Sequence, residues 1–276
     1  MKPAAFGYSV PESASGAMGT LEQAGGTAKL VAGSQSLGPL LNLRLTRPGA
    51  LVDVAMLPEL RATRETADGV TIGAATTHAE IEDGDVPDPT PGWLGKVAAN
   101  IAHRAVRNRG TLGGSLAHAD PAADWPVVML ALEAVIIIEG PDGRREVAAE
   151  DFLTGPFETC LGPADLIIAV SVPRPPAAAG WAYWKYCRQV GEFAKASAAV
   201  LTLSSSGEPR IAIGALSSQP QLITGEAARR LLAGAVDVGE AVSDLLPDTA
   251  SRERALHVTA LGNALGLATD AAGKQP

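Results

Sequence analysis

The sequence predicts an α+β fold, on three observations. Short apolar runs rich in β-branched residues are mixed with segments of helical periodicity along the whole chain of 276 residues. No internal repeat is evident. The proline-rich segment 173–180 interrupts both patterns, so we place a domain boundary there, between residues 1–175 and a separate small α/β unit over 176–276.

The elements of the first half follow from local patterns. Strands are predicted over 28–33, 51–54 and 70–73, because each is a short apolar run near turn residues. Leucines at near-helical spacing predict a helix from Leu37, which Pro48-Gly49 ends. Thr77 and Glu80 match a capping box, which satisfies the first free N–H groups of a further helix.

The second half contains one clear helix start and several strands. Asp120 followed by Pro121 offers a capping carboxylate and a proline at the first helical position, and predicts a helix over 121–132. The remaining predicted elements are strands over 134–139, 166–172, 181–188, 200–204 and 210–215, and helices over 226–233 and 251–268.

Composition excludes several classes of function. A net charge of −8 argues against a broad nucleic-acid-binding surface. The first residues lack an apolar signal core, and no apolar run approaches the roughly 18 residues of a membrane span, so we expect a cytoplasmic protein. Cys160 and Cys187 are too far apart in sequence to indicate an iron–sulfur or zinc site. If the protein performs redox work, its electron carrier must therefore be organic.

Two glycine-rich loops carry the main functional signal. Residues 107–115 place two arginines before a run of small residues, and bare backbone N–H groups in such a turn can form an anion site. Residues 32–36 form the other loop, which is the first along the chain and precedes a helix, where free N–H groups also favour phosphate. Each loop alone is also compatible with an ordinary turn. Together they indicate a long phosphate-bearing cofactor, although neither a Rossmann nor a P-loop motif occurs.

Other candidate residues have a structural and a functional interpretation. Asp120 and Asp124 fit a helix cap and a first-turn charge, or acceptors for ribose or ribityl hydroxyls. His78, at a helix start, is expected to be structural rather than a ligand. Lys185 is compatible with a surface charge on a strand, and Phe193 is compatible with an aromatic residue on a mobile loop. No nucleophile, base and carboxylate set and no metal site is evident, so we predict no catalytic side chain and no bound metal.

These segments, in their order and spacing, resemble the FAD-binding medium subunit of the molybdenum hydroxylases, the group that includes carbon monoxide dehydrogenase and bacterial xanthine dehydrogenase. The resemblance covers residues 1 to about 215 and, more loosely, the C-terminal unit. The segments that carry it are Ala32–Leu37, Leu43–Leu45 with Arg47-Pro48, Leu51–Val54, Ile72–His78, Val106–Ser115 and Ala119–Asp124.

The resemblance implies a two-subdomain FAD-binding region of the vanillyl-alcohol-oxidase type, with subdomains of about 1–57 and 58–175, and a C-terminal domain of sheet and helices. The two loops would hold the FAD diphosphate. Asp124 would bond the sugar-like chain of the flavin, Lys185 would lie near the isoalloxazine ring, and Phe193 would gate access. The full set of implied cofactor contacts is Ala32, Gly33, Ser34, Gln35, Ser36, Leu37, Thr76, His78, Gly110, Thr111, Leu112, Gly113, Gly114, Ser115, Ala119, Asp120, Asp124, Lys185 and Phe193.

The chain also departs from the family. Members usually carry a second glycine at the position of Ser34 and often histidine at that of Gln35, and the segment 83–89 replaces a longer family sequence. Arg107 and Arg109 are expected to support the loop or to face a partner subunit.

The implied role is electron transfer within a complex. A large molybdopterin-binding partner would oxidise the substrate, and two [2Fe–2S] clusters on a small partner would pass electrons to the FAD of this chain, which would deliver them to an external acceptor. The assembly would be a dimer of three-subunit units, a heterohexamer. Two alternatives stay open, a self-contained flavin oxidase of the vanillyl-alcohol-oxidase type and an assembly subunit without flavin.

Overall fold

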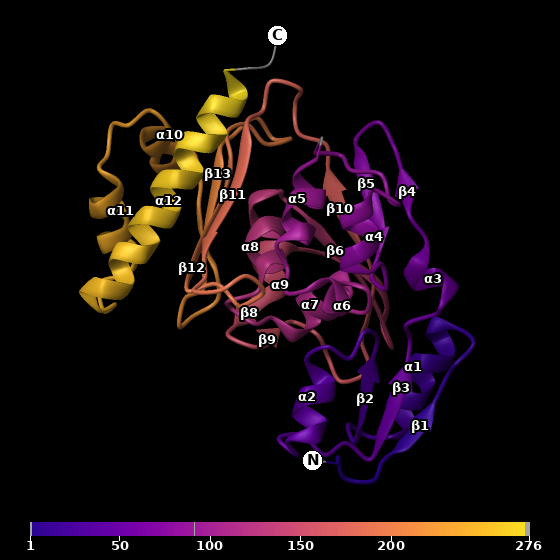
Figure 1. The fold of residues 1–276 in the computed structure, drawn as a ribbon. Coiled ribbons are helices and arrows are strands. Elements are labelled where there is room, and N and C mark those ends of the chain that lie inside the picture. Colours follow the sequence, from indigo (N-terminus) through magenta and orange to yellow (C-terminus); the bar gives the residue numbers. More distant parts are fainter. Residues whose placement is uncertain (1, 91, 274–276) are drawn as a thin grey trace.

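Three β-sheets of different character form the framework of the computed structural model, which describes residues 2–90 and 92–273 (Figure 1). The N-terminal sheet lies at one end of the molecule, the central sheet with most of the short helices lies in the middle, and the C-terminal sheet carries the last three helices. The mixture confirms the predicted α+β class.

The N-terminal sheet is parallel and small. Its strands β1 (Gly7–Ser9), β3 (Ala50–Asp53) and β2 (Ala28–Val31) lie in that order, and its helices are α1 (Ala14–Gln23) and α2 (Leu37–Asn42). Strand β2 and helix α2 are joined by the first glycine-rich loop, so this loop lies at the carboxyl end of a parallel strand. Ligands of α/β units commonly bind at this end of the strands.

The central sheet is antiparallel, with strand order β4-β5-β10-β6-β7. These strands span Arg64–Glu65, Gly69–Gly73, Leu166–Pro173, Val135–Gly140 and Gly143–Ala148, and β8 (Leu153–Gly155) and β9 (Glu158–Thr159) form a separate hairpin. The helices of this region are α3 (Pro58–Arg61), α4 (His78–Asp83), α5 (Trp93–Ala99), α6 (Arg104–Arg107), α7 (Leu112–His118), α8 (Asp124–Ala131) and α9 (Ala149–Phe152).

The C-terminal sheet is an antiparallel meander of β11 (Trp181–Tyr186), β12 (Ala196–Leu201), β13 (Arg210–Gly214) and β14 (Gln221–Ile223). The long helix α12 (Ser251–Ala272) packs on one face of this sheet, beside α10 (Gly225–Leu232) and α11 (Val238–Leu245) (Figure 1). Helix α8 packs on the other face, against β12 and β13.

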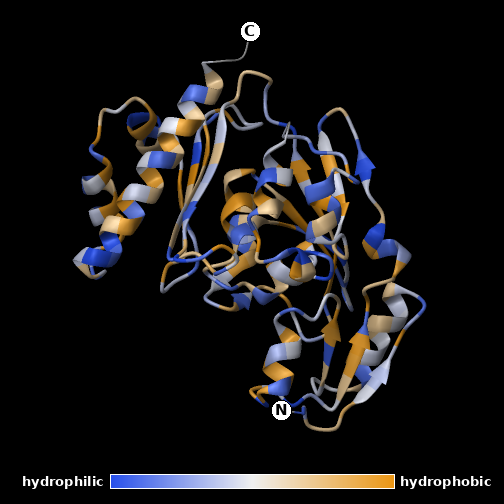
Figure 2. Cartoon of the chain, in the orientation of Figure 1, coloured by the Kyte–Doolittle hydropathy of each residue, from blue (hydrophilic) through white to orange (hydrophobic). Residues whose placement is uncertain are grey.

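Helix α8 is the central element of the core. All of its residues, Asp124–Ala131, are buried, and Figure 2 shows hydrophobic residues concentrated in it and in the strands beside it. A helix that is apolar on every side must be enclosed by protein or lipid. Within residues 2–90 and 92–273, no helix combines the length and hydropathy that crossing a membrane requires.

Among the predicted elements that differ from the structure, three differ for a clear local reason. The helix expected over 121–132 begins at Asp124 with Ala123 as its N-cap, because the Asp120 carboxylate accepts the N–H of Ala122 at 2.9 Å and forms a turn instead of a cap. The strand expected over 200–204 spans 196–201, since Ser204 already belongs to a turn. The second glycine loop becomes helix α7 from Leu112.

Candidate functional site: a cavity between the two glycine loops

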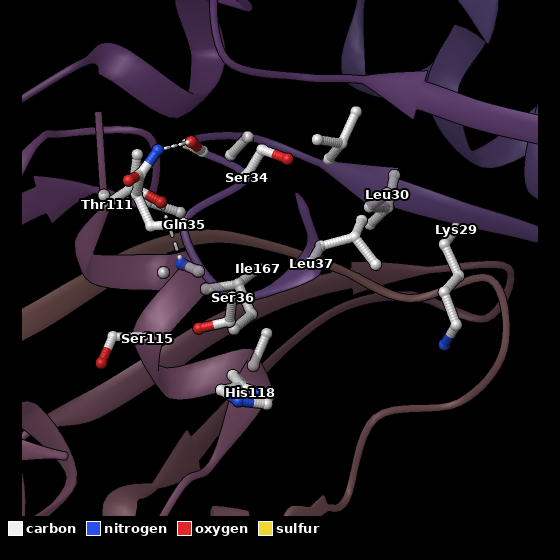
Figure 3. Close-up of a pocket in the computed structure, with 18 of the residues that line it drawn as sticks. Lys29, Leu30, Ser34, Gln35, Ser36, Leu37, Thr111, Ser115, His118 and Ile167 are labelled. Carbon is white, nitrogen blue, oxygen red and sulfur yellow. Dashed lines mark hydrogen bonds between the residues drawn. The ribbon is translucent and has the colours of Figure 1, made fainter. Parts of the chain in front are cut away.

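A cavity of about 750 Å³ lies between the N-terminal and central sheets, and both glycine-rich loops line it. Figure 3 shows Ser34, Gln35, Ser36 and Leu37 facing Thr111 and Ser115 across this space. The segment Leu161–Ile167 and the loop Gly191–Phe193 complete the wall. Its volume is within the range of sites that hold organic ligands and cofactors.

The first loop presents unused backbone donors. In the described part of the chain, the N–H groups of residues 34–37 donate to no other protein group, whereas the Gln35 side chain donates to the Gly33 carbonyl at 2.8 Å. Ser34 adopts a φ of 61°, in the left-handed region. Several free amides in one concave turn attract an anion, so this loop suits a diphosphate.

Backbone N–H groups of the second loop already have hydrogen-bond partners within the protein. The N–H of Leu112 donates to the Thr76 carbonyl at 3.0 Å, and that of Gly113 to the Ala74 carbonyl at 2.9 Å. The Gly114 N–H donates to the Thr111 hydroxyl, the N-cap of α7, at 3.1 Å. The expectation that the bare amides of this loop bind an anion is therefore wrong for Leu112 and Gly113, because both amides already have carbonyl partners.

His78 lies under the second loop as a neutral side chain. It is the first residue of helix α4, lies between Thr77 and Glu80 of a complete capping box, and is buried. Trp125 Nε1–H donates to His78 Nδ1 at 3.1 Å, so the proton of the neutral imidazole is on Nε2. Burial, and to a smaller extent the charge of Arg107, lower the His78 pKa to about 4. Its ring borders both Gly110 and the cavity.

Asp124 connects the cavity to the C-terminal sheet. Its Oδ1 accepts from Lys185 Nζ at 2.7 Å and from the Tyr183 hydroxyl at 2.8 Å, and Lys185 also donates to the Asn100 carbonyl at 2.8 Å. The side chains of Asp124 and Lys185 are only 6% and 9% exposed. Burial raises the Asp124 pKa, and the charge of Lys185 opposes that rise.

The cavity mouth carries an exposed aromatic. Phe193 lines the cavity while its side chain is 56% exposed. Nearby, Gly191 has a φ of 92°, and a Cβ atom there would lie 2.6 Å from the His103 ring. The loop therefore rests directly on His103 through a residue that has no side chain.

The two arginines of the second loop have different roles. Arg107 forms a bidentate ion pair with Glu82 at 2.7 and 2.8 Å and donates to the Ile101 and Ala102 carbonyls. It thus supports the loop, as expected. Arg109 is exposed and forms no ion pair with another described residue.

Most of the candidate residues come together at the cavity, and four do not line it. Thr76 acts through its backbone carbonyl, Leu112 is fully buried, and Lys185 lies behind Asp124. Ala119 has a left-handed φ of 47° that ends helix α7. The lining candidates are Ala32, Gly33, Ser34, Gln35, Ser36, Leu37, His78, Gly110, Thr111, Gly113, Gly114, Ser115, Asp120, Asp124 and Phe193.

Several parts of the wall carry no signal in the sequence, and two of them lie close to the second loop or to the central sheet. Leu161–Ile167 precede and enter a buried strand and carry no recognisable cofactor motif. His118 lies one helical turn beyond Ser115 on α7 and lines the cavity (Figure 3), and its ring centroid lies 5.2 Å from that of Phe157. Helical spacing from Thr111 and Ser115 would have identified His118 once the loop was recognised as a helix.

The fold and the cavity define an α+β protein that binds an extended, phosphate-bearing cofactor. A family model for the FAD-binding domain in molybdopterin dehydrogenase matches residues 4–175. The chain therefore belongs to the family of FAD-binding medium subunits of the molybdenum hydroxylases, and it is an oxidoreductase subunit with FAD as its cofactor. The free amides of the first loop and the carboxylate of Asp124 fit the diphosphate and the hydroxyls of that cofactor.

Curated relatives and solved structures agree with this assignment. The chain is 41% identical over 209 residues to the 6-hydroxypseudooxynicotine dehydrogenase complex subunit alpha of Paenarthrobacter nicotinovorans, covering 75% of this chain and 71% of the relative. It is 37% identical over 243 residues to the carbon monoxide dehydrogenase medium chain of Hydrogenophaga pseudoflava, covering 88% and 85%. The reconstituted CO dehydrogenase of Oligotropha carboxidovorans superposes with a TM-score of 0.89 at 31% identity, covering 98% and 100%.

Proposed function

We propose that this chain is the electron-transfer subunit of a multi-subunit molybdenum hydroxylase. It would accept electrons from [2Fe–2S] clusters on a small partner subunit and pass them to an external acceptor. Bound FAD supplies the redox chemistry, because a flavin can exchange electrons singly or in pairs. The single observation that carries the proposal is the cavity that joins the free amides of the first loop to an open mouth at Phe193.

Different residues of the chain would bind different parts of the cofactor. The amides of residues 34–37 would bind the diphosphate, and Asp120 and Asp124 would accept from hydroxyl groups of the cofactor. Lys185 does not line the cavity, and its positive charge would act on the cofactor site by pairing with the Asp124 carboxylate. Phe193 would gate the entry of the acceptor at the mouth. None of these side chains is required as an acid or a base, since the protein contributes position and electrostatics.

The partners belong to the same proposal. The curated relatives include proteins named as medium chains and as complex subunits. We infer a large molybdopterin-binding subunit and a small iron–sulfur subunit, assembled with this chain as a heterohexamer. We also place the complex in the cytoplasm, in line with two free and well-separated cysteines.

A spectrum and a pull-down test the proposal. The isolated chain is incubated with FAD and desalted, and its visible spectrum is recorded. We expect flavin absorbance to remain with the protein, and the tagged chain to co-purify with two further subunits from its native host. Absence of retained flavin would sink the proposal in favour of an assembly subunit without flavin. Substrate oxidation by the isolated holo-chain would instead favour a self-contained flavin oxidase.

A further inference from the structure

One side chain of the C-terminal sheet reaches the cofactor cavity indirectly and has no role in the function proposed above. Tyr183 lies on β11, where Trp181, Tyr183 and Lys185 share the face toward helices α5 and α8. Ala182 and Trp184 pack on the other face, in the cluster around α12. Tyr183 therefore belongs to the face that meets the cofactor-binding region.

The contacts of Asp124 are unevenly divided between its two oxygens. Oδ1 accepts from both Tyr183, at 2.8 Å, and Lys185, at 2.7 Å. Oδ2 accepts from no other residue in the described ranges, and Asp124 lines the cavity. A carboxylate has about four acceptor positions, so one oxygen occupied by two donors leaves the other available.

We propose that Tyr183 is a positioning residue for the cofactor: its hydroxyl, together with Lys185, holds Oδ1 of Asp124 away from the cavity and leaves Oδ2 to accept a hydrogen bond from a ribityl hydroxyl of FAD. This inference rests on the proposed binding of FAD in the cavity. Without the Tyr183 hydroxyl, the flexible Lys185 ammonium would be the one remaining side-chain partner of Oδ1 and could move to Oδ2, where it would compete with the cofactor.

The burial of the group makes this arrangement energetically important. A buried carboxylate needs its hydrogen-bond partners, because water cannot replace them. Burial and the neighbouring Asp124 charge also raise the Tyr183 pKa well above 10, so the phenol keeps its proton and acts only as a donor toward Asp124. The donor is therefore present throughout the neutral pH range.

The test compares Tyr183→Phe with Tyr186→Phe in the full-length chain. Tyr186 is on the same strand, faces the opposite side and forms no hydroxyl hydrogen bond with another described residue, so it controls for loss of a phenol. Each apo-protein is titrated with FAD and with FAD analogues that lack the 2′-, 3′- or 4′-hydroxyl of the ribityl chain. Binding is followed by quenching of flavin fluorescence.

The wild type and Tyr186→Phe should lose roughly tenfold in affinity for one of the deoxy analogues, the loss expected for one hydrogen bond to a charged group. Tyr183→Phe should bind FAD roughly tenfold more weakly and discriminate against that analogue by less than about threefold. The ratio is measured within one variant, so a general loss of stability does not produce it. If Tyr183→Phe keeps the full discrimination, or the wild type shows none, the inference is overturned while FAD binding stands. If the wild type does not bind FAD at all, the proposed function itself fails.

Discussion

Gly33 and Arg109 touch backbone to backbone. A Cβ atom on Gly33 would lie 2.5 Å from the carbonyl carbon of Arg109 and nearer still to its oxygen, and it would lie 2.8 Å from the Cα of Gly110. The contact joins two loops whose glycines, Gly33 and Gly110, are 77 positions apart (110 − 33). Gly33 and Gly110 both line the cavity, so the absence of a side chain at Gly33 is a condition for bringing the two loops together at the site.

Gly33→Ala should separate the loops and abolish retention of FAD. The new methyl group would overlap backbone atoms, which cannot rotate away, and overpacking of this kind costs about 1–3 kcal/mol. Thermal unfolding and a desalting assay for bound flavin measure the two effects. Gly19→Ala, on helix α1 with no atom within 4 Å of the new Cβ, is the matched control and should be neutral or slightly stabilising. Retention of FAD by Gly33→Ala at the wild-type level would contradict the argument.

Local sequence signals predicted about half of the helices and strands, and contacts between residues far apart in the sequence form the site. The capping box at Thr77 and Glu80 is confirmed, because both of its hydrogen bonds join residues three apart. Strand β7 was missed: its sequence, Gly143–Ala148, is polar and mostly exposed at the sheet edge, and it has no apolar alternation to detect. Edge strands commonly lack that signal.

The sequence predicted which loops line the site, but it did not predict the hydrogen bonds and the ion pair within it. Both glycine loops were identified, and both line one cavity. The carbonyls that occupy the amides of Leu112 and Gly113 come from Thr76 and Ala74, some 40 residues earlier. The pairing of Asp124 with Lys185 spans 61 positions and depends on how the C-terminal sheet packs on α8. No spacing rule in the sequence encodes such contacts, because they arise only when separate elements pack.

Ser34→Gly should maintain or raise both the free energy of unfolding and the FAD affinity. Ser34 has a φ of 61°, and a left-handed conformation costs a residue with a Cβ atom roughly 1–2 kcal/mol, whereas glycine adopts it freely. After the greater flexibility of glycine in the unfolded chain is subtracted, we expect the free energy of unfolding to be unchanged or to rise by up to about 1 kcal/mol. FAD affinity should be at least as high. Urea unfolding and flavin titration measure both quantities.

Ser36→Gly is the matched control for that substitution. Ser36 has a φ of −103°, a conformation that requires no glycine, so the same change there should lower the free energy of unfolding by about 0.5–1 kcal/mol. If both variants lose stability equally, the strain assigned to Ser34 is absent.

His78 should make the protein sensitive to acid. Burial lowers its pKa from 6.5 to about 4. Between these two pH values the His78 side chain is therefore protonated in the unfolded chain and neutral in the folded protein. The contribution of His78 to the free energy of unfolding is therefore fully present above pH 6.5. It is lost as the pH falls toward 4, by about 3 kcal/mol in all. His78→Asn keeps an acceptor for Trp125 and does not titrate, and urea unfolding from pH 7.5 to 4.5 should show a flatter profile for it. His257, whose pKa burial also lowers, is present in both proteins and cancels. Parallel profiles would contradict the assignment.

Phe193→Ala should change access to the flavin more than its binding. The side chain is 56% exposed, so its removal sacrifices little buried surface, and both thermal stability and FAD affinity should stay close to those of the wild type. The mouth would open, and oxidation of the reduced protein by dissolved oxygen, followed by the return of flavin absorbance in a stopped-flow instrument, should be several-fold faster. Val190→Ala alters an exposed side chain of the same loop that does not line the cavity, and it should leave the rate unchanged. Equal rates for the wild type and Phe193→Ala would show that the aromatic ring does not gate the mouth, whereas weakened FAD binding would assign it a direct contact with the cofactor.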